Sequence, residues 1–392
     1  MLRSLFSGIS GMRTHQQMMD VTGNNIANVN TAGFKSSQAI FEDTLSQMLQ
    51  AAGAPQNGNG GTNPAQVGLG VRMAGISTNF GQGATQNTGR ATDLAISGDG
   101  FFVVNNGTEN VYTRAGAFLF DANGNLVTSS GAKVQGWVAN ATGAVNTNGQ
   151  LQEVTLGTGI MLPRATTTAS FVGNLPGDTA DGTEITTSIG VYDAQGVESQ
   201  LSLTLRKQAA PAPAWDISYD GGATYPGDEI DFATSPATIT LPNAPAGVTV
   251  NLSGLTNYAG ESTLTPGTQD GWAMGSLAAY SISPDGTVTG SYTNGYKQDI
   301  ARIAMATFNN PNGLEKAGGS AFRTSVNSGE PEIGIAGSGG RGVLQGGSLE
   351  MSNVDLGQEF TNLVIAQRGF QANSRVISTS DELLQELVNL KR

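Results

Sequence analysis

The hydrophobic and polar positions follow a helical period at both ends of the chain and a strand-like period between them. Over residues 2–28, apolar positions recur at alternating steps of three and four, the spacing of a helix that packs along a seam. Residues 355–390 have a similar stripe on one flank, so the pattern predicts a long amphipathic helix at each end. The predicted interface residues are Leu2, Leu5, Ile9, Met12, Met19 and Ile26 in the first helix, and Leu356, Phe360, Leu363, Phe370, Ile377, Leu384 and Leu387 in the second.

Neither predicted helix can bury its stripe within its own segment. Each therefore needs the other helix, a neighbouring copy of the chain, or both. Asp355 and Gln358 form a plausible capping pair at the start of the second helix. The pattern by itself leaves open a simpler alternative, in which the two helices form a hairpin that closes one globular domain.

The interior of the chain has the alternation and turn chemistry of antiparallel strands. From Val71 to Trp137, strand-sized apolar runs are separated by turn sequences, including a hairpin turn at Asn123-Gly124. Further along, residues 185–193 and 198–206 alternate on either side of a turn, and Trp215 and Ile217 continue the period on a third strand. Such alternation predicts sheets with one buried and one wet face.

These patterns predict an α+β multidomain fold, with terminal helices pairing as a coiled-coil-like inner domain followed by two nested, mainly antiparallel β domains. Residues 51–66 are rich in Gly, Asn and Pro, which is typical of a flexible linker. The expected parts are a helical domain of residues 1–30 and 355–392, a linker of 31–70, a middle β domain of 71–142 and 277–345, and an inserted outer β domain of 143–276.

Composition narrows the class of protein. The formal net charge is −12 and only 13% of residues are charged, with Lys and Arg scattered, which disfavours nucleic acid as a partner. Cysteine is absent, so disulfides, thiolate metal sites and thiol nucleophiles are excluded. No stretch has the roughly 18 apolar residues that a membrane span requires. Polar residues interrupt the first helix too often for the apolar core of a cleavable signal.

The chemical motifs are weak, and the sequence predicts no catalytic, cofactor-binding or metal-binding residue. Residues 337–342 match G-x-G-x-x-G, but no strand-helix context for a dinucleotide surrounds them. The run from Asp121 to Asn125 favours a hairpin turn over a calcium loop, because the terminal Glu of such a loop is missing. His15 is the single histidine and is expected to be a solvated helix residue. An enzyme is therefore disfavoured.

Residues 7–35 closely resemble the N-terminal signature of the bacterial flagellar rod, hook and hook-associated proteins. Residues 349–392 resemble the matching C-terminal signature, and segments within 95–137 and 285–347 look like the shared middle domain. The motif residues are Gly23, Asn24, Asn25, Ile26, Ala27, Asn28, Gly33 and Phe34 near the first helix, and Ser352, Asn353, Val354, Asp355, Gln371, Ala372 and Asn373 near the second.

Within this family, the resemblance favours a hook type of subunit over a rod type, since residues 143–276 have no clear counterpart in short rod subunits. It implies a subunit that self-assembles into a curved, flexible tube, transmits torque from rod to filament and encloses an export channel. The implied partners are further copies of the chain, a rod protein, a hook-cap protein, a hook-filament junction protein and the flagellar export apparatus. The implied location is extracellular, in the flagellum, after export without a cleaved signal.

Two alternatives remain at the sequence level. One is a distal-rod type of subunit. The other is an extracellular β-rich adhesive or binding protein whose helical ends serve as anchors. Deleting residues 143–276 separates the adhesive from the hook hypothesis, because an adhesive would lose its activity whereas a hook subunit would keep a tube core.

Overall fold

The computed structural model describes residues 2–54, 60–140, 143–157, 159–209, 214–219, 222, 225, 229–232, 238–240 and 247–389. Contacts divide the chain into two compact units. Unit 1 comprises Met1–Leu156, Ser281–Thr289 and Asp299–Arg392, and unit 2 comprises Gly157–Tyr280 and Gly290–Gln298.

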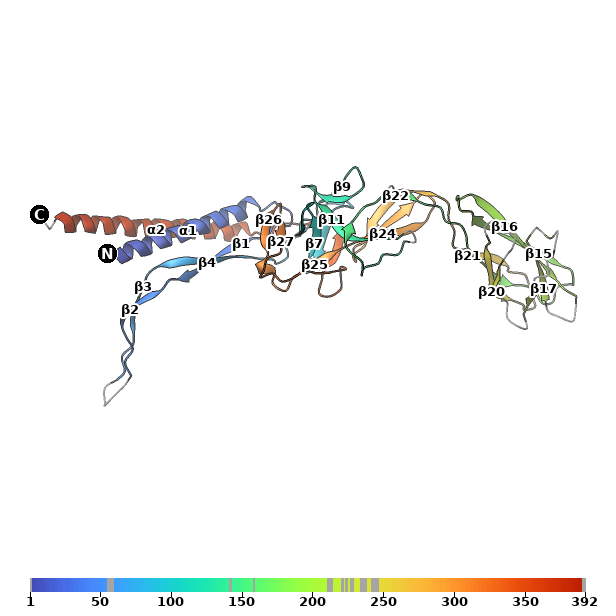
Figure 1. The fold of residues 1–392 in the computed structure, drawn as a ribbon, viewed down its shortest axis with the longest axis horizontal. Helices are drawn as coiled ribbons and strands as arrows, with labels where there is room; N and C mark the ends of the chain where they lie inside the picture. The colour runs from blue at the N-terminus through green and yellow to red at the C-terminus, as the bar shows by residue number, and fades with distance from the viewer. Residues whose placement is uncertain are drawn as a thin grey trace. The chain divides into compact units, whose positions relative to one another are not determined.

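Two long helices lie at the ends of the chain, as the sequence predicts. Helix α1 spans Leu2–Ala27 and helix α2 spans Leu356–Asn389. They run side by side and antiparallel, so that both chain ends lie at the same end of the pair (Figure 1). Asp355 caps α2, since its Oδ1 accepts hydrogen bonds from the backbone N–H groups of Gly357 at 2.8 Å and Gln358 at 3.2 Å.

The β part of unit 1 is built from short, mostly antiparallel strands. Its central strands pair in the order β24, β11, β7, β8, β27 and β26. The strands before unit 2 are β1 (Ser37–Asp43), β2 (Ser46–Gln50), β3 (Ala65–Gly68), β4 (Val71–Thr78), β5 (Thr85–Asn87), β6 (Leu94–Ser97), β7 (Phe101–Asn105), β8 (Asn110–Thr113), β9 (Phe118–Phe120), β10 (Leu126–Thr128), β11 (Lys133–Val138) and β12 (Gln152–Glu153). The later ones are β24 (Lys297–Ile303), β25 (Met305–Thr307), β26 (Glu315–Gly318), β27 (Ala321–Arg323), β28 (Glu332–Gly334), β29 (Val343–Gly346) and β30 (Ser348–Glu350), with a 3₁₀ turn at Pro311–Gly313.

Two apolar clusters lie on opposite faces of strand β7, as its alternating side chains require. Phe102 and Val104 belong to a mainly aliphatic core with Leu94 and Ile96. Phe101 and Val103 belong to an aromatic cluster that includes Phe308. Strand β7 is therefore buried on both faces, which explains its continuous apolar run in the sequence.

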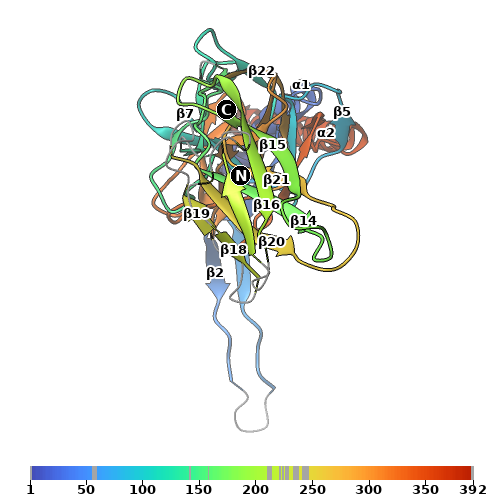
Figure 2. The ribbon, with the colours of Figure 1, turned by 90° about the vertical axis from the view of Figure 1, so that its right-hand side faces the viewer.

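Residues 37–78 differ from the predicted linker. Strand β1 pairs antiparallel with β4 over its whole length, and β2 pairs with β3, so the described residues 37–54 and 60–78 form the two arms of a long hairpin. The outer strands β2 and β3 form a two-stranded sheet of their own and every residue in them is exposed (Figures 1 and 2). A composition rich in Gly and Asn does not distinguish a linker from a two-stranded ribbon. Residues 55–59 of the predicted linker lie outside the described part of the chain.

Unit 2 contains two four-stranded sheets around one core. One sheet has the order β15, β16, β17, β18, and the other has the order β19, β20, β14, β21. The predicted pair at residues 185–193 and 198–206 is confirmed, with Ile189 opposite Leu201, and Trp215 lies fully buried on the third strand. The strands are β13 (Ile160–Met161), β14 (Thr168–Asn174), β15 (Glu184–Tyr192), β16 (Glu198–Lys207), β17 (Ala214–Ser218), β18 (Glu229–Asp231), β19 (Thr238–Thr240), β20 (Thr249–Thr256) and β21 (Thr265–Gln269).

The chain crosses between the units within strands β22 (Gly275–Ile282), β23 (Thr287–Tyr292) and β24. The pairing of β14 with β20 is parallel, an exception to the expected antiparallel arrangement. Strand β12, which the sequence placed in the inserted domain, pairs with β11 in unit 1. The predicted domain limits therefore differ in detail from the unit boundaries and stay a prediction.

Candidate assembly site

Helices α1 and α2 meet along small and polar residues. A Cβ atom added at Gly11 would lie 2.8 Å from the Asn373 side chain, and one added at Gly369 would lie 2.5 Å from the His15 ring. Ser4 Oγ lies 3.5 Å from Ser380 Oγ. These pairs run antiparallel along the two helices, and the missing side chains let the two backbones approach closely.

The predicted stripe of α1 lies beside this seam. Gly8 and Gly11 are buried in the contact, whereas Ile9 and Met12, one residue later in each case, are only partly buried. Leu5, Met19 and Ile26 are also partly buried. A shift of one residue turns a helix by about 100°, so the predicted stripe forms the flank next to the contact. The side chains of Leu2 and Leu387 lie outside the described residues.

In α2 the predicted stripe divides into two parts. Leu363, Phe370, Ile377 and Leu384 are partly buried along the side that faces α1. Leu356 and Phe360 are exposed, and Phe360 retains 52% of its accessible surface. Val364 extends this exposed side, while Ile365, Val376 and Leu383 form a second exposed apolar side across the seam. Helix α2 thus presents apolar side chains on both sides of its contact with α1.

His15 differs from its predicted solvated state. Its ring is half-buried between Gly369 and Phe41, with a ring centroid distance of 6.0 Å to Phe41 in an edge-to-face arrangement. Its Nδ1 atom is buried without a hydrogen-bond partner. The residue packs α1 against both α2 and the root of the hairpin, which a helical pattern alone does not reveal.

A cluster of polar side chains, all buried except the partly buried Asn353, joins the inner ends of the helices to the β part of unit 1. We call it the junction cluster, and it consists of Asn25, Lys35, Arg114, Glu350, Asn353 and Glu359. Glu350 is its centre: Oε1 accepts from Lys35 Nζ at 2.6 Å and from the Gly83 N–H at 2.9 Å. Its Oε2 faces Arg114 Nη1 at 3.4 Å. Burial lowers the pKa of Lys35 below its ordinary value of 10.5, and the bond to Glu350 opposes that shift.

Amide side chains tie the same segments together. Asn25 exchanges two hydrogen bonds with the backbone of Ser37, at 2.7 and 3.0 Å, and donates to Glu359 Oε1 at 3.0 Å. Asn353 accepts from the Ser36 N–H at 2.8 Å and donates to the carbonyl oxygens of Asn79 and Gly81. Asn25 thus satisfies the buried backbone groups of Ser37, and Asn353 ties the segments before β1 and after β4 to the start of α2.

The structure brings some family-motif residues together and leaves others apart. Asn25 and Asn353 belong to the junction cluster, and Gly33 donates its N–H to the Glu350 carbonyl at 2.8 Å. Asn373 lies in the helix seam. Asn24, Ala27, Gln371 and Ala372 are exposed, as is Gly23, which has nothing near its Cβ position. Ile26, Asn28, Phe34, Ser352 and Val354 are partly buried, and Asp355 is the exposed cap of α2.

Sequence reasoning did not select Lys35, Arg114 and Glu350 as site residues. Arg114 and Glu350 carry no local pattern, because a charge is buried only when a distant partner meets it. Lys35 offered a weak signal: it is a single charge that follows the uncharged run of residues 21–34 within the family-like segment.

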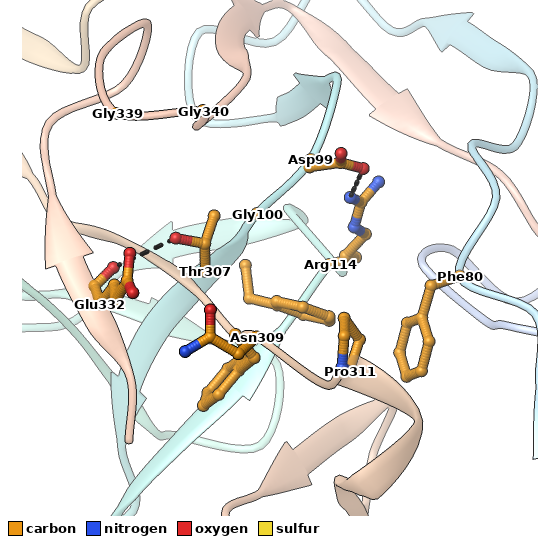
Figure 3. A pocket seen from close by; sticks show the side chains of 12 residues that line it. Phe80, Asp99, Gly100, Arg114, Thr307, Asn309, Pro311, Glu332, Gly339 and Gly340 are labelled. Atoms are coloured by element: carbon orange, nitrogen blue, oxygen red, sulfur yellow. Dashed lines mark hydrogen bonds and ion pairs between the residues drawn. The ribbon is translucent and has the colours of Figure 1, made fainter. Parts of the chain in front are cut away.

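A cavity of about 280 Å³ lies beside the junction cluster. Phe101 and Phe308 form part of its wall, and Arg114 extends along it toward Asp99, 3.9 Å away (Figure 3). The Asp99 side chain is 92% exposed, so this pair is weak. The cavity therefore belongs to the edge of the junction cluster.

The described part of the chain offers neither a cluster of metal ligands nor a membrane-spanning helix. No group of three or more His, Asp or Glu side chains is placed to hold a metal ion there. Nor does any helix among those residues have the length and apolar character needed to cross a membrane.

Three family models match the chain. Residues 5–35 match flagella basal body rod protein, residues 95–172 match the flagellar hook protein FlgE/F/G D1 domain, and residues 345–390 match the flagellar basal body rod FlgEFG protein C-terminal region. Together with the paired terminal helices, these matches define the class as the rod and hook proteins of the bacterial flagellum.

Full-length relatives narrow this class. The chain is 38% identical to the flagellar hook protein FlgE of Borreliella burgdorferi, with both chains covered completely. It is 34% identical to the flagellar hook protein FlgE of Salmonella typhimurium, over 99% of this chain and all of the relative. The chain belongs to the flagellar hook protein family, whose members are structural proteins. The crystal structure of Helicobacter pylori flagellar hook protein FlgE2 shares the fold, with a TM-score of 0.52 and 15% identity over 68% of this chain and all of the other.

Proposed function

We propose that this protein is a structural subunit of the flagellar hook, and that many copies assemble into a curved, flexible tube around an export channel. The observation that carries the proposal is the pair of exposed apolar sides on α2. One helix contact is already made within the chain, yet Phe360 and Ile365 remain 52% and 54% exposed on different sides. Exposed apolar surface of this kind marks a protein interface.

The proposed inner layer of the tube consists of α1 and α2, paired as a coiled-coil-like unit. Identical head-to-tail contacts that do not close into a ring generate a helical tube, so each interface is heterologous. The two apolar sides of α2 and the flank of Leu5, Ile9, Met12, Met19 and Ile26 on α1 supply these contacts. The β strands of both units then provide the contacts that transmit torque between neighbouring copies.

The proposed partners follow from the place of a hook in the flagellum. A rod protein lies at one end of the tube, a hook-cap protein covers the growing tip, and a hook-filament junction protein follows. The chain reaches the extracellular part of the flagellum through the flagellar export apparatus, without cleavage of a signal. The proposal also includes the domain limits and the family-motif residues that the sequence predicts.

A rod subunit is the second candidate, because one full-length relative bears that name. The chain is 36% identical to the flagellar basal-body rod protein FlgG of Bacillus subtilis, over the whole of both chains. Length therefore does not separate the two functions. Deleting the gene and imaging basal bodies does: complete rods without hooks support a hook subunit, and truncated rods support a rod subunit.

Substitution of an exposed apolar residue tests the assembly surface. We expect Phe360→Gln to leave the free chain folded, because the side chain is half-exposed, and to reduce tube formation at least about tenfold, since burying one large apolar side chain contributes about 1.5–3 kcal/mol. Electron microscopy of hooks and pelleting of polymerised chain measure the effect. Arg375→Gln, another exposed position on α2, is the control and should polymerise normally. Normal tubes with Phe360→Gln would contradict this surface.

A further inference from the structure

The three charged side chains at the centre of the junction cluster are almost completely withdrawn from water. Lys35 and Glu350 have fully buried side chains, and that of Arg114 is 2% exposed. Two cations therefore share one buried carboxylate. The nearest other carboxylate to Arg114 is that of Asp99, which is exposed and 3.9 Å away. Among the described residues, Glu350 is the one carboxylate that pairs with both cations, while Lys35 also donates to the Gly81 carbonyl at 2.8 Å and Arg114 to the Gly98 carbonyl at 2.9 Å.

These groups come from distant parts of the chain. Glu350 follows Lys35 by 315 residues and Arg114 by 236 residues. The main chain at Glu350 accepts the Gly33 N–H, and its carboxylate accepts the Gly83 N–H. Glu350 therefore bonds to three segments that precede it in the chain, namely those that contain Gly33 and Lys35, Gly83, and Arg114.

We propose that docking of Glu350 fixes the terminal helices to the β part of unit 1. We call this arrangement the lock. Before Glu350 docks, Lys35 and Arg114 cannot both be buried, so residues 33–37 stay detached and α1 is free to reorient. Once Glu350 docks, both cations become paired, the backbone bonds at Gly33 and Gly83 close, and α1 and α2 are fixed to the β part together.

The reason lies in the cost of a buried charge without a partner. Removing one member of a buried ion pair is strongly destabilising, because the remaining charge keeps its desolvation penalty and loses its compensation. Loss of Glu350 leaves two such cations, whereas loss of Lys35 leaves an intact Arg114–Glu350 pair. Loss of Glu350 should therefore cost more stability than loss of Lys35. If these side chains only filled space, the two losses would not differ in this way.

Through the lock, docking of residue 350, which precedes α2, determines whether residues 33–37, which follow α1, are held in place. In a chain that emerges N-terminus first, residues 33–37 are not held until residue 350 has also emerged and docked. For a tube subunit, this means that α1 and α2 do not take their fixed orientation until residue 350 is present. The lock itself does not depend on the hook assignment, because it is a property of the single chain.

Amide hydrogen exchange in the free, full-length chain tests the lock. We expect Glu350→Gln to speed the exchange of the Gly33, Ser36, Ser37 and Gly83 amides by at least about 100-fold, from the cost of a broken buried pair. Lys35→Met should speed the same amides by no more than about tenfold, since one balanced pair remains. The amides of β7 should stay protected in both variants.

Glu153→Gln is the matched control, because Glu153 is paired with Lys133 but both side chains are nearly half exposed. It should leave all these amides unchanged. Exchange within about twofold of the original in Glu350→Gln, or equal effects of Glu350→Gln and Lys35→Met, would overturn the lock. If Glu350→Gln also exposes β7, the double variant Lys35→Met/Glu350→Gln, which leaves only Arg114 unpaired, should recover part of the protection there, and no recovery would equally overturn the lock. A failed hook assembly assay would leave these outcomes unaffected.

Discussion

Gly33 lies where the chain turns from the end of α1 toward strand β1. Its φ is +69°, in the left-handed region that side chains with a Cβ rarely adopt. A Cβ atom there would lie 2.4 Å from the Ala115 backbone nitrogen. The position therefore combines an unusual backbone angle with a close approach of another segment. Both demands exclude any residue except glycine.

We expect Gly33→Ala to lower the free energy of unfolding by about 3 kcal/mol or more, from left-handed strain together with an overpacked contact. Gly89→Ala is a matched control, because Gly89 has the same φ of +69° but nothing within 4 Å of its Cβ position. The control should cost about 1–2 kcal/mol from backbone strain alone. Denaturant unfolding of the two variants measures the difference, and equal costs would show that the contact with Ala115 is unimportant.

At the scale of the element, the helix pair depends on a close approach through small residues. Gly11 faces Asn373, and Gly369 faces His15. Apolar side chains elsewhere on the helices remain exposed, including Phe6 at 63% on the face of α1 opposite the seam. The pair is therefore held by backbone proximity along its seam, while its apolar sides stay available for other contacts.

We expect Gly369→Ala to destabilise the helix pair by about 1–3 kcal/mol, because the new Cβ would meet the His15 ring. In the double variant His15→Ala/Gly369→Ala the ring is gone, so the combined cost should be smaller than the sum of the single costs. Thermal unfolding followed by circular dichroism gives both values. Gly23→Ala, where nothing lies within 4 Å, should be neutral or stabilising by up to about 1 kcal/mol. Additive costs would show that the two positions do not interact.

The limits of the helices could be predicted from the sequence, but the face that each presents could not. Residues 2–28 and 355–390 were predicted helical, and the helices end within one residue of these limits. The apolar period identifies a helix because it repeats every three or four residues. Which side meets the partner depends on how closely two backbones approach, and Gly8 and Gly11 decide this although they carry no hydrophobic signal.

At the scale of the whole molecule, each unit contains an aspartate whose charged form is favoured by folding. In unit 1, burial tends to raise the pKa of Asp285, but hydrogen bonds from Thr287 and the Arg302 guanidinium outweigh it and bring the pKa below its usual 3.8. In unit 2, burial opposes the hydrogen bonds from Thr167 and Thr168 at Asp270, with the same net direction. Each unit thus gains stability from an ionised carboxylate.

Acidification should therefore destabilise both units. A carboxyl whose pKa is lower in the folded state contributes its full stability above the unfolded value near 3.8, and loses it as the pH falls through the folded value. We expect the melting temperature to fall as the pH drops below about 4. Asp285→Asn should weaken this dependence for unit 1 and Asp270→Asn for unit 2. An unchanged pH dependence in both variants would exclude these residues as its source.

The candidate site was predictable only in part. Asn25, Gly33 and Asn353 were selected from the family-like segments, and the structure places them at the junction cluster. Arg114 and Glu350 were not selected, because the reason for their burial is a partner more than 200 residues away in sequence. Local patterns report on neighbours within a few turns of chain, whereas ion pairs of this kind are long-range.

The amino-acid sequence by itself determined the two terminal helices, the β character of the interior, the turn at Asn123-Gly124 and the family resemblance. All of these depend on local period, on turn chemistry or on the order of residues within short segments. Only the tertiary structure decided that β1 pairs with β4 and β2 with β3, that small residues line the helix seam and that one carboxylate holds two buried cations. These features depend on which distant segments meet in space, and that outcome is set by packing and charge compensation across the whole chain.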